Sequence, residues 1–506
     1  MISPVDSSGT GEQGAIEPQS FIASDSVLYE ETPPNNAYSP SWTDWKSTEE
    51  QLQRRYLRAP FTNSGVPLRQ ALLDSFAGNF GHWFSFINTS QIHEKPPLLQ
   101  NAFLMAGSLA RRIETVDDLQ LPYALYQQSK EAIYASDGKD PITLLMAITI
   151  MSCWSLRPPS IISLDGPWHW TGLAMRLALQ IGLHSERIYS HLQDSDNCRL
   201  VWWHLVNGDV LQAACWGRPC LIQTRHQDVE LPAKSDLDTI PLQAFNQITR
   251  LLLILRQVIE LDMLQLSDVV AALVDWHRTV AFPLKLHNVA GARNSYNRPI
   301  NEMFVFYFGI IIFVFFRHDM TEGHRTYVSP ITIAASSCMV RLLEEIHYHE
   351  DTPRLCSIHG FFFMLAAIPQ IFHRTQVAEK EHQRERELDL ICDILRHLRV
   401  KYGGSNMVLQ KISKLRDGSH NLSESQPMAA HQGGLPKPVT GVVSGGNLLF
   451  PFPVDFSPNL DLLDSCVSGN EDQMDMMDFL AFESSLIDWS APGSLELSDF
   501  PQSLFV

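Results

Sequence analysis

Apolar positions recur at helical spacing through the middle of the chain, from about Val66 to Leu415. Between Pro167 and Ile181, large apolar side chains return every three or four residues, and Gly182 follows them. This is the pattern of an amphipathic helix that packs one face on a core and ends at a glycine cap. Because strict alternation of apolar and polar residues is scarce in the same region, the pattern predicts an all-α fold.

A second helix has both of its ends marked. Asp140 is a capping residue before Pro141 at the first helical position, and Pro158 follows the apolar stretch from Ile142 to Leu156. The same reasoning predicts further helices over Leu98 to Arg112, Pro122 to Tyr134, Pro241 to Met263, Ser267 to Phe282, Asn301 to Phe316, Pro330 to His349 and Thr375 to Lys401. In the last of these, the stripe of Leu388, Ile391, Leu395 and Leu398 fits either docking on the same domain, which short stripes favour, or a short coiled-coil seam.

The flanks of this helical body have a different composition. Residues 1–64 are rich in Ser, Pro, Gly, Asn and acids, which predicts a disordered acidic N-terminal tail. Residues 417–446 are rich in Gly, Ser and Pro and are expected to be a flexible linker. Residues 447–506 are acidic again. The domain plan is therefore two tails and a linker around one helical domain over 66–415.

Charge follows the same division. The 506 residues carry 56 acids and 38 bases, a formal charge of −18, and no base follows Lys437. The two ends hold most of this excess, so the body is nearly neutral. A protein with this balance lacks the broad basic surface that nucleic acids or anionic membranes attract.

Several classes of site are disfavoured by motif and spacing. The longest apolar run, Met303 to Phe316, has 14 residues, fewer than the roughly 20 that span a bilayer, so it predicts a buried helix and no membrane association. The eight cysteines form no paired metal-ligand spacing, and no P-loop, GxSxG or HExxH motif is present. We expect no enzyme activity, no catalytic or metal site and no cofactor in this chain.

The C-terminal tail interleaves acids with large apolar residues. Acids keep such residues in water, and a helix formed on binding would present them to a groove of a transcriptional coactivator. The alternative is an inert tail, or one that folds back on the body. The candidate activation residues are Phe450, Phe452, Phe456, Met474, Met477, Phe479, Leu480, Phe482, Leu486, Ile487 and Trp489.

The most distinctive stretch runs from Gly166 to Pro232. It reads as a helix, a turn, a second helix with a wide aromatic face, a second turn and an irregular exit. Asp209 lies at the flank of the second helix, where a poorly solvated carboxylate needs a partner, and we expect an ion pair with Arg218 or Arg176. The elements that define the stretch are Gly172, Arg176, Gly182, Leu183, His184, Arg199, Trp202, Trp203, Asp209, Gly217, Arg218, Pro219, Leu231 and Pro232.

In order and spacing, these elements resemble the fungal-specific transcription factor domain, the middle homology region of fungal zinc-cluster regulators. Leu68 to Phe86 is similar to the opening helix of such domains, so the resemblance covers about Val66 to Leu415. It implies a nuclear regulator of RNA polymerase II transcription. It further implies an activator specific for one metabolic pathway, such as a secondary-metabolite gene cluster.

One departure from the family concerns DNA. Zinc-cluster regulators carry an N-terminal cluster of six cysteines that binds zinc and reads DNA, whereas no cysteine precedes Cys153. Zinc and promoter DNA are therefore expected only if an upstream exon or a partner supplies that module. The alternative is a helical co-regulator without DNA contacts, recruited by a partner transcription factor. The sequence also leaves open whether the chain forms a homodimer.

Overall fold

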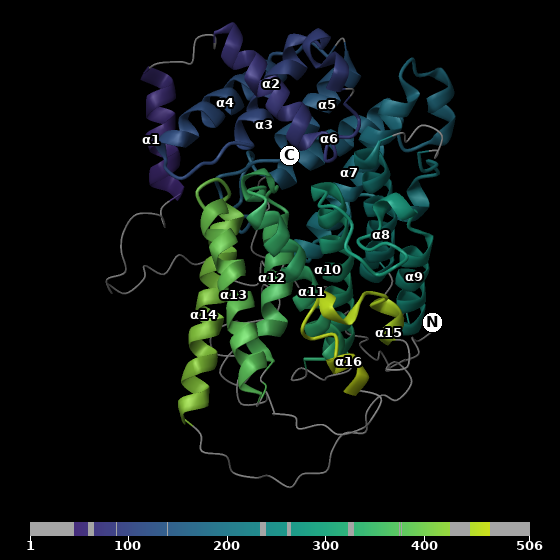
Figure 1. The fold of residues 1–506 in the computed structure, drawn as a ribbon. Coiled ribbons are helices and arrows are strands. Elements are labelled where there is room, and N and C mark those ends of the chain that lie inside the picture. The colour runs from purple at the N-terminus through teal and green to yellow at the C-terminus, as the bar shows by residue number, and fades with distance from the viewer. Residues whose placement is uncertain are drawn as a thin grey trace, which may run out of the picture.

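The computed structural model describes residues 45–58, 65–87, 89–138, 140–232, 239–260, 265–321, 328–373, 375, 377–425 and 446–465. These residues form helices and connecting turns (Figure 1). An isolated bridge between His287 and Arg293 is the nearest approach to a sheet in the described ranges. The predicted all-α class is confirmed for this part of the chain.

The N-terminal helices form the upper layer of Figure 1, in purple and blue. Within this layer α3 packs against α2, α4 and α5, and α5 packs against α6. The bounds are α1 Trp45–Arg58, α2 Val66–Phe80, α3 Pro97–Leu109, α4 Gln120–Tyr134, α5 Pro141–Met151 and α6 Pro167–Ile181.

The remaining long helices stand beside one another below this layer (Figure 1). The most extensive pairing joins α10 to α11, and α10 also packs on α8 and α12. The bounds are α7 Ser195–Trp216, α8 Ile240–Glu260, α9 Leu266–Thr279, α10 Arg298–Thr321, α11 Pro330–Tyr348, α12 His359–Phe372, α13 Ala378–Leu398 and α14 Gly403–Ser425. The short α15 Gly446–Leu449 and α16 Leu462–Ser465 lie by α9 and α11.

Short 3-10 helices connect several of the α-helices. They are η1 Thr89–Glu94, η2 Asp117–Leu119, η3 Glu186–His191, η4 Thr224–His226, η6 Phe282–Leu284, η7 Thr352–Arg354 and η9 Val454–Phe456. One connected cluster of buried apolar residues runs through both layers. The body is therefore held together by a single core.

At the centre of this core is α10. By length and composition, residues 298–318 could cross a membrane, but 89% of the most apolar window is buried against other helices. Burial of this kind is what a core helix of a globular domain requires. The apolar run from Met303 to Phe316 is thus confirmed as part of a buried helix, which begins three residues before the predicted start at Asn301 and ends five residues after the predicted end at Phe316.

Local end signals located several helices correctly. The predicted helix from Pro167 to Ile181 matches α6, and Gly182 caps it with a φ of 95°, a conformation that glycine adopts without steric cost. Asp140 caps α5 by accepting a hydrogen bond from the Thr143 N–H. However, α5 ends at Met151, five residues before the predicted end.

The predicted N-terminal tail is too long. Helix α1 lies inside the stretch assigned to it and packs on α4, with Leu52 buried. Glu49 accepts two hydrogen bonds from Arg157, at 2.9 and 3.0 Å. Because this helix makes tertiary contacts, the folded body begins by Trp45; residues 1–44 lie outside the described part of the chain.

One further boundary is wrong, and one helix was missed. Helix α14 continues to Ser425, inside the predicted linker over 417–446. Helix α12 was not predicted, because its sequence is apolar on all sides and contains Pro369, so that no amphipathic period marks it. Its fourteen residues nevertheless form a regular helix, which is buried between α11, α13 and α14.

The apolar stripe of α13 docks within its own domain. Leu388, Ile391, Leu395 and Leu398 are at most 1% exposed, and α13 packs on α11, α12 and α14. A coiled coil would need this face to be free. The docking alternative is therefore the correct one.

Candidate functional site

The turn between α6 and α7 is fixed by hydrogen bonds within the distinctive stretch. Leu183 is fully buried, and its carbonyl accepts a hydrogen bond from the Tyr189 hydroxyl at 2.8 Å. Arg199, in the first turns of α7, forms a two-pronged ion pair with Glu186, at 2.5 and 2.6 Å. Bidentate pairs of this kind set both distance and orientation, so they fix how η3 lies against α7.

The tryptophan pair holds the irregular exit. Trp202 Nε1 donates to Gln227 Oε1 at 2.8 Å, and Trp203 Nε1 donates to the Glu230 carbonyl at 3.0 Å. Both indoles are buried. The exit that contains the half-buried Leu231 and Pro232 is thereby attached to α7, which explains the spacing between the Trp pair and the Leu-Pro element.

The ion pair predicted for Asp209 is wrong. Its carboxylate accepts backbone hydrogen bonds from Leu221, at 3.0 and 2.8 Å, and from Ile222, at 3.3 Å. Burial raises the pKa of Asp209 to about 6, although these N–H groups oppose that shift. By accepting these backbone hydrogen bonds, Asp209 fixes the position of the chain that follows the second turn.

The two arginines that were expected to pair with Asp209 lie elsewhere. Arg218 lies over the rings of Trp168 and Trp216, at 4.7 and 5.3 Å from their centroids, a cation–π arrangement. Arg176 is exposed on α6. Sequence alone could not distinguish these partners, because an arginine satisfies a carboxylate or an aromatic face equally well.

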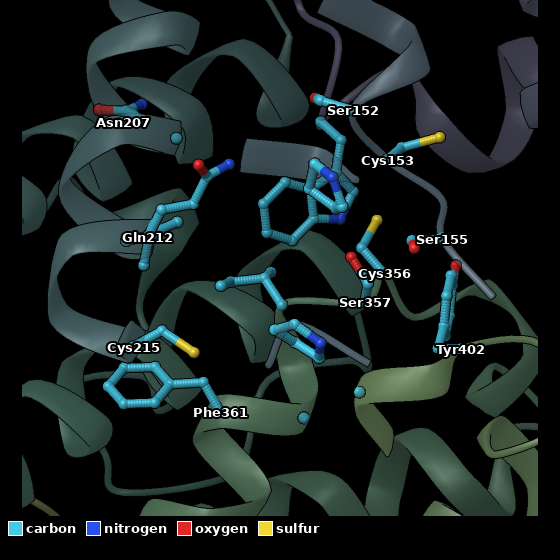
Figure 2. A pocket seen from close by; sticks show the side chains of 18 of the residues that line it. Ser152, Cys153, Ser155, Asn207, Gln212, Cys215, Cys356, Ser357, Phe361 and Tyr402 are labelled. Atoms are coloured by element: carbon cyan, nitrogen blue, oxygen red, sulfur yellow. The ribbon is translucent and has the colours of Figure 1, made fainter. Parts of the chain in front are cut away.

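A cavity of about 150 Å³ lies beside α7. Four of its lining residues recur at intervals of four along this helix, which places them on one stripe: His204, Gly208, Gln212 and Trp216. A parallel stripe supplies Asn207, Leu211 and Cys215. Figure 2 shows Gln212 and Cys215 on one side of the cavity and Cys356, Ser357 and Tyr402 on the other.

The remaining lining residues come from distant parts of the chain. They belong to the turn after α2, the segment between α5 and α6, α8, the start of α12 and the start of α14. Most are apolar, including Phe84, Phe245, Phe361, Leu252 and Val408. A mostly apolar pocket with a few converging polar groups is typical of a small-molecule site.

The polar groups of the cavity are uncharged or already paired. His204 Nδ1 lies 2.9 Å from the Trp83 carbonyl, which can only accept, so Nδ1 carries the proton. Burial lowers the pKa of His204 to about 4, which keeps it neutral. Arg157, at the edge, is neutralised by Glu49.

Thiols line the cavity but are not poised for reaction. Burial raises the pKa of Cys153 to about 12 and that of Cys356 well above its usual value. Burial also raises the pKa of Cys215. Because the thiolate is the reactive form, these side chains contribute soft apolar surface to the wall.

Sequence reasoning did not find this cavity. The signal was present in α7, where His204, Gly208 and Gln212 interrupt a buried apolar helix at four-residue intervals. The other walls could not be foreseen, because they join segments as far apart in the sequence as His82 and Val408.

The start of the predicted activation tail is docked on the body. Phe452 packs on His277, Phe304 and Phe308, with ring centroids 5.3, 6.0 and 5.4 Å away. The Tyr307 hydroxyl donates to the Leu449 carbonyl at 2.8 Å. We call residues 446–465 the docked segment; it is drawn in yellow in Figure 1.

Polar contacts fix the other end of the docked segment. Asn459 donates to Ser337 Oγ at 2.6 Å, and Lys380 pairs with Asp461 at 2.6 Å. Phe450 and Phe456 are buried.

These contacts correct one prediction, since Phe450, Phe452 and Phe456 are not exposed activation residues but part of the core. The other candidates lie outside the described residues: Met474, Met477, Phe479, Leu480, Phe482, Leu486, Ile487 and Trp489.

No group of three or more His, Cys, Asp or Glu side chains in the described ranges is placed to hold a metal ion. The zinc implied by the resemblance therefore has no set of ligands in this part of the chain.

Comparison with known proteins identifies a matching region. Residues 73–304 match the family described as "Fungal specific transcription factor domain". The matched region spans α2 to the start of α10 and includes all of α6 and α7. This family comprises transcription factors rather than enzymes, which supports the expectation of a non-enzymatic protein.

Two curated relatives are distant. The Acetamidase regulatory protein of Aspergillus fumigatus is 25% identical over 194 residues, which are 38% of this chain and 24% of the relative. Cutinase transcription factor 1 alpha of Fusarium vanettenii is 27% identical over 152 residues, 28% of this chain and 16% of the relative. The matches thus span about a quarter or less of either relative.

Proposed function

Because the chain carries a fungal specific transcription factor domain over residues 73–304, we propose that it is a nuclear, pathway-specific regulator of RNA polymerase II transcription. The observation that carries this proposal is the intact α6–α7 unit, in which the signature residues hold the turn, the Trp pair and the exit together. Both curated relatives bear names of regulators. A metabolic pathway, such as a secondary-metabolite gene cluster, is the proposed target.

The direction of regulation is proposed to be activation, through the acidic residues after Ser465. Eight acids follow that residue, and no base does. Acids interleaved with Met477, Phe479 and Trp489 suit binding to a coactivator groove. Because the docked segment packs on the body, the proposed activation region begins after it.

A reporter assay tests this proposal. The full chain is fused to a foreign DNA-binding domain and compared with a variant in which Met477, Phe479, Leu480 and Trp489 are all alanine. We expect reporter activity with the fusion and most of it lost in the variant, because hydrophobic anchors dominate such interfaces. The matched control replaces four serines of the same tail by alanine. An inactive fusion, or equal activity of fusion and variant, would refute activation by this region.

DNA contact is proposed to come from a zinc-cluster module encoded upstream or from a partner protein. A chain with a net charge of −18 gains little from counterion release on DNA. The same observation favours a second candidate, a co-regulator recruited by another transcription factor. Sequencing the 5′ end of the transcript separates them: six in-frame cysteines upstream support the first candidate, and a start at Met1 supports the second.

A further inference from the structure

Three of the residues that line the cavity beside α7 are glycines that the backbone does not require. They are Gly208 on α7, Gly360 on α12 and Gly404 on α14. All three lie inside helices, and none has the positive φ that favours glycine. A Cβ added to any of them would come no closer than 3.5 Å to a neighbouring atom, which is ordinary van der Waals contact. Neither backbone conformation nor close packing therefore explains why these positions have no side chain.

A glycine in a helix and an unfilled volume both reduce stability. Glycine is less favourable than alanine inside a helix, and protein interiors are packed so closely that few voids exceed the size of a water molecule. In this chain the three glycines instead border a cavity of about 150 Å³. A ligand in the cavity would restore the contacts that its walls lack.

The walls set the size and polarity of such a ligand. Phe84, Phe245 and Phe361 provide aromatic surface from the turn after α2, from α8 and from α12. An engineered apolar cavity of about 150 Å³ in another protein holds benzene. The half-buried Pro159 and Pro167 also belong to the lining, so this edge of the cavity lies near the surface of the body. The cavity thus suits an apolar molecule of about the size of one aromatic ring.

The described lining residues offer no unpaired charge to an ionised ligand. Arg157, at the edge, is paired with Glu49 at 2.9 Å. His82 Nε2 lies 3.2 Å from the Glu302 carboxylate, and burial lowers the pKa of His204 to about 4, which keeps that ring neutral. An ionised ligand would lose its hydration without gaining a counterion, so the ligand is expected to be neutral.

We infer that the cavity binds a small, neutral, apolar molecule of about the size of one aromatic ring, and that Gly208, Gly360 and Gly404 leave room for it. Its walls come from both layers of the body, so a bound molecule would contact both. This inference does not rest on the proposed regulatory function, because binding is measured on the purified chain.

Toluene and benzoate are matched probes, since they share the ring and differ in the methyl or carboxylate group that it carries. Isothermal titration with the full chain at neutral pH should show saturable binding of toluene and no binding of benzoate. Toluene should also raise the midpoint of thermal unfolding, because a ligand that binds only the folded state stabilises it.

Gly208→Leu should weaken toluene binding about tenfold or more, because the new side chain takes up part of the cavity. The matched control is Gly172→Leu on α6. A Cβ added to Gly172 also meets nothing within 4 Å, but this residue does not line the cavity. We expect the control to bind toluene like the wild type. If leucine at position 208 prevents folding, Gly208→Ala replaces it and should weaken toluene binding about 2- to 3-fold.

Three results would overturn the inference. The first is that toluene does not bind the wild type or does not saturate. The second is that benzoate binds as tightly as toluene. The third is that the substitution at Gly208 changes toluene affinity no more than the substitution at Gly172 does.

Discussion

Helices α7 and α10 are both long and buried, but their surroundings differ. In the middle of α10, a Cβ added to Gly309 would lie 2.4 Å from the Phe362 ring. In the middle of α7, a Cβ added to Gly208 would meet nothing nearer than Thr171 Cγ2 at 4.0 Å. Burial alone therefore does not distinguish the two helices, whereas the space beside each helix does.

Buried polar atoms without a hydrogen-bond partner occur on both helices. On α7, Gln212 Oε1 has no partner in the described residues. On α10, Asn301 Oδ1 accepts from Arg293 and its Nδ2 donates to Glu345, both at 2.8 Å, but Arg298 and Glu302 keep atoms without a hydrogen bond in the described part of the chain. The space beside each helix, rather than the pairing of its polar atoms, therefore distinguishes the two.

The largest effect is expected at Glu302 on α10. Its Oε2 accepts from Trp83 Nε1 at 2.8 Å and lies 3.2 Å from His82 Nε2, and its Oε1 lies 3.3 Å from Arg298 Nε. Glu302→Ala should reduce the free energy of unfolding by about 3–5 kcal/mol, because it leaves the buried Arg298 uncompensated. Denaturant titration measures this change.

The control is Glu344→Ala, which removes a more exposed pair with Arg341 and should cost about 0–1 kcal/mol. Equal losses for the two variants would contradict the view that the buried charges of α10 stabilise the fold.

A pH-dependent effect is expected at Asp209 on α7. The pKa of about 6 in the folded protein exceeds the ordinary value of 3.8, so the folded state binds the proton more tightly. The contribution of Asp209 to stability should therefore fall as pH rises between these values, by about 1 kcal/mol per pH unit. The difference in the free energy of unfolding between the wild type and Asp209→Asn should change across this pH window. The control is Asp196→Asn, an exposed residue in the first turn of α7; a change across the window as large as that of Asp209→Asn would contradict the assignment of the effect to the buried Asp209.

The two central glycines provide a matched pair. Gly309→Ala should destabilise the protein by about 1–3 kcal/mol, because the ring of Phe362 must move in a packed core. Gly208→Ala should be neutral or stabilising by up to about 1 kcal/mol, since alanine favours the helix and the space beside it is open. Thermal unfolding measures both. Destabilisation by Gly208→Ala as large as that by Gly309→Ala would remove the contrast between the helices.

The smallest effect on stability is expected at Gln212. Gln212→Leu loses a hydrogen bond to Thr171 but also removes an unpaired oxygen, so the free energy of unfolding should change by less than about 1 kcal/mol. Asn301→Leu on α10 should cost about 1–3 kcal/mol, because both side-chain polar atoms of Asn301 are paired. Denaturant titration of both variants sharpens the comparison, and a larger loss at Gln212 would argue that its role is structural.

Sequence reasoning located elements whose ends are set by local chemistry. Gly182 and Asp140 mark their helices correctly because a cap acts on its own few residues. It failed for α12, whose helical state depends on burial from all sides, and for the docked segment, whose phenylalanines find partners on α9 and α10. It also failed for Asp209, because the accepted N–H groups come from a loop whose path only the tertiary structure sets.

The candidate site was predicted only in part. The stretch from Gly166 to Pro232 identified the unit that carries α7, but not the cavity beside it. Cavities arise where distant segments leave a volume unfilled, and no local pattern records that volume.

The docked segment also acts as an intramolecular ligand of the body. Lys380 on α13 pairs with Asp461, and Tyr307 on α10 donates to Leu449, so the docked segment links these two helices. A segment of the same chain acts on its binding face at an effective concentration of about millimolar. A second molecule that competes for this face would therefore have to displace an intramolecular ligand.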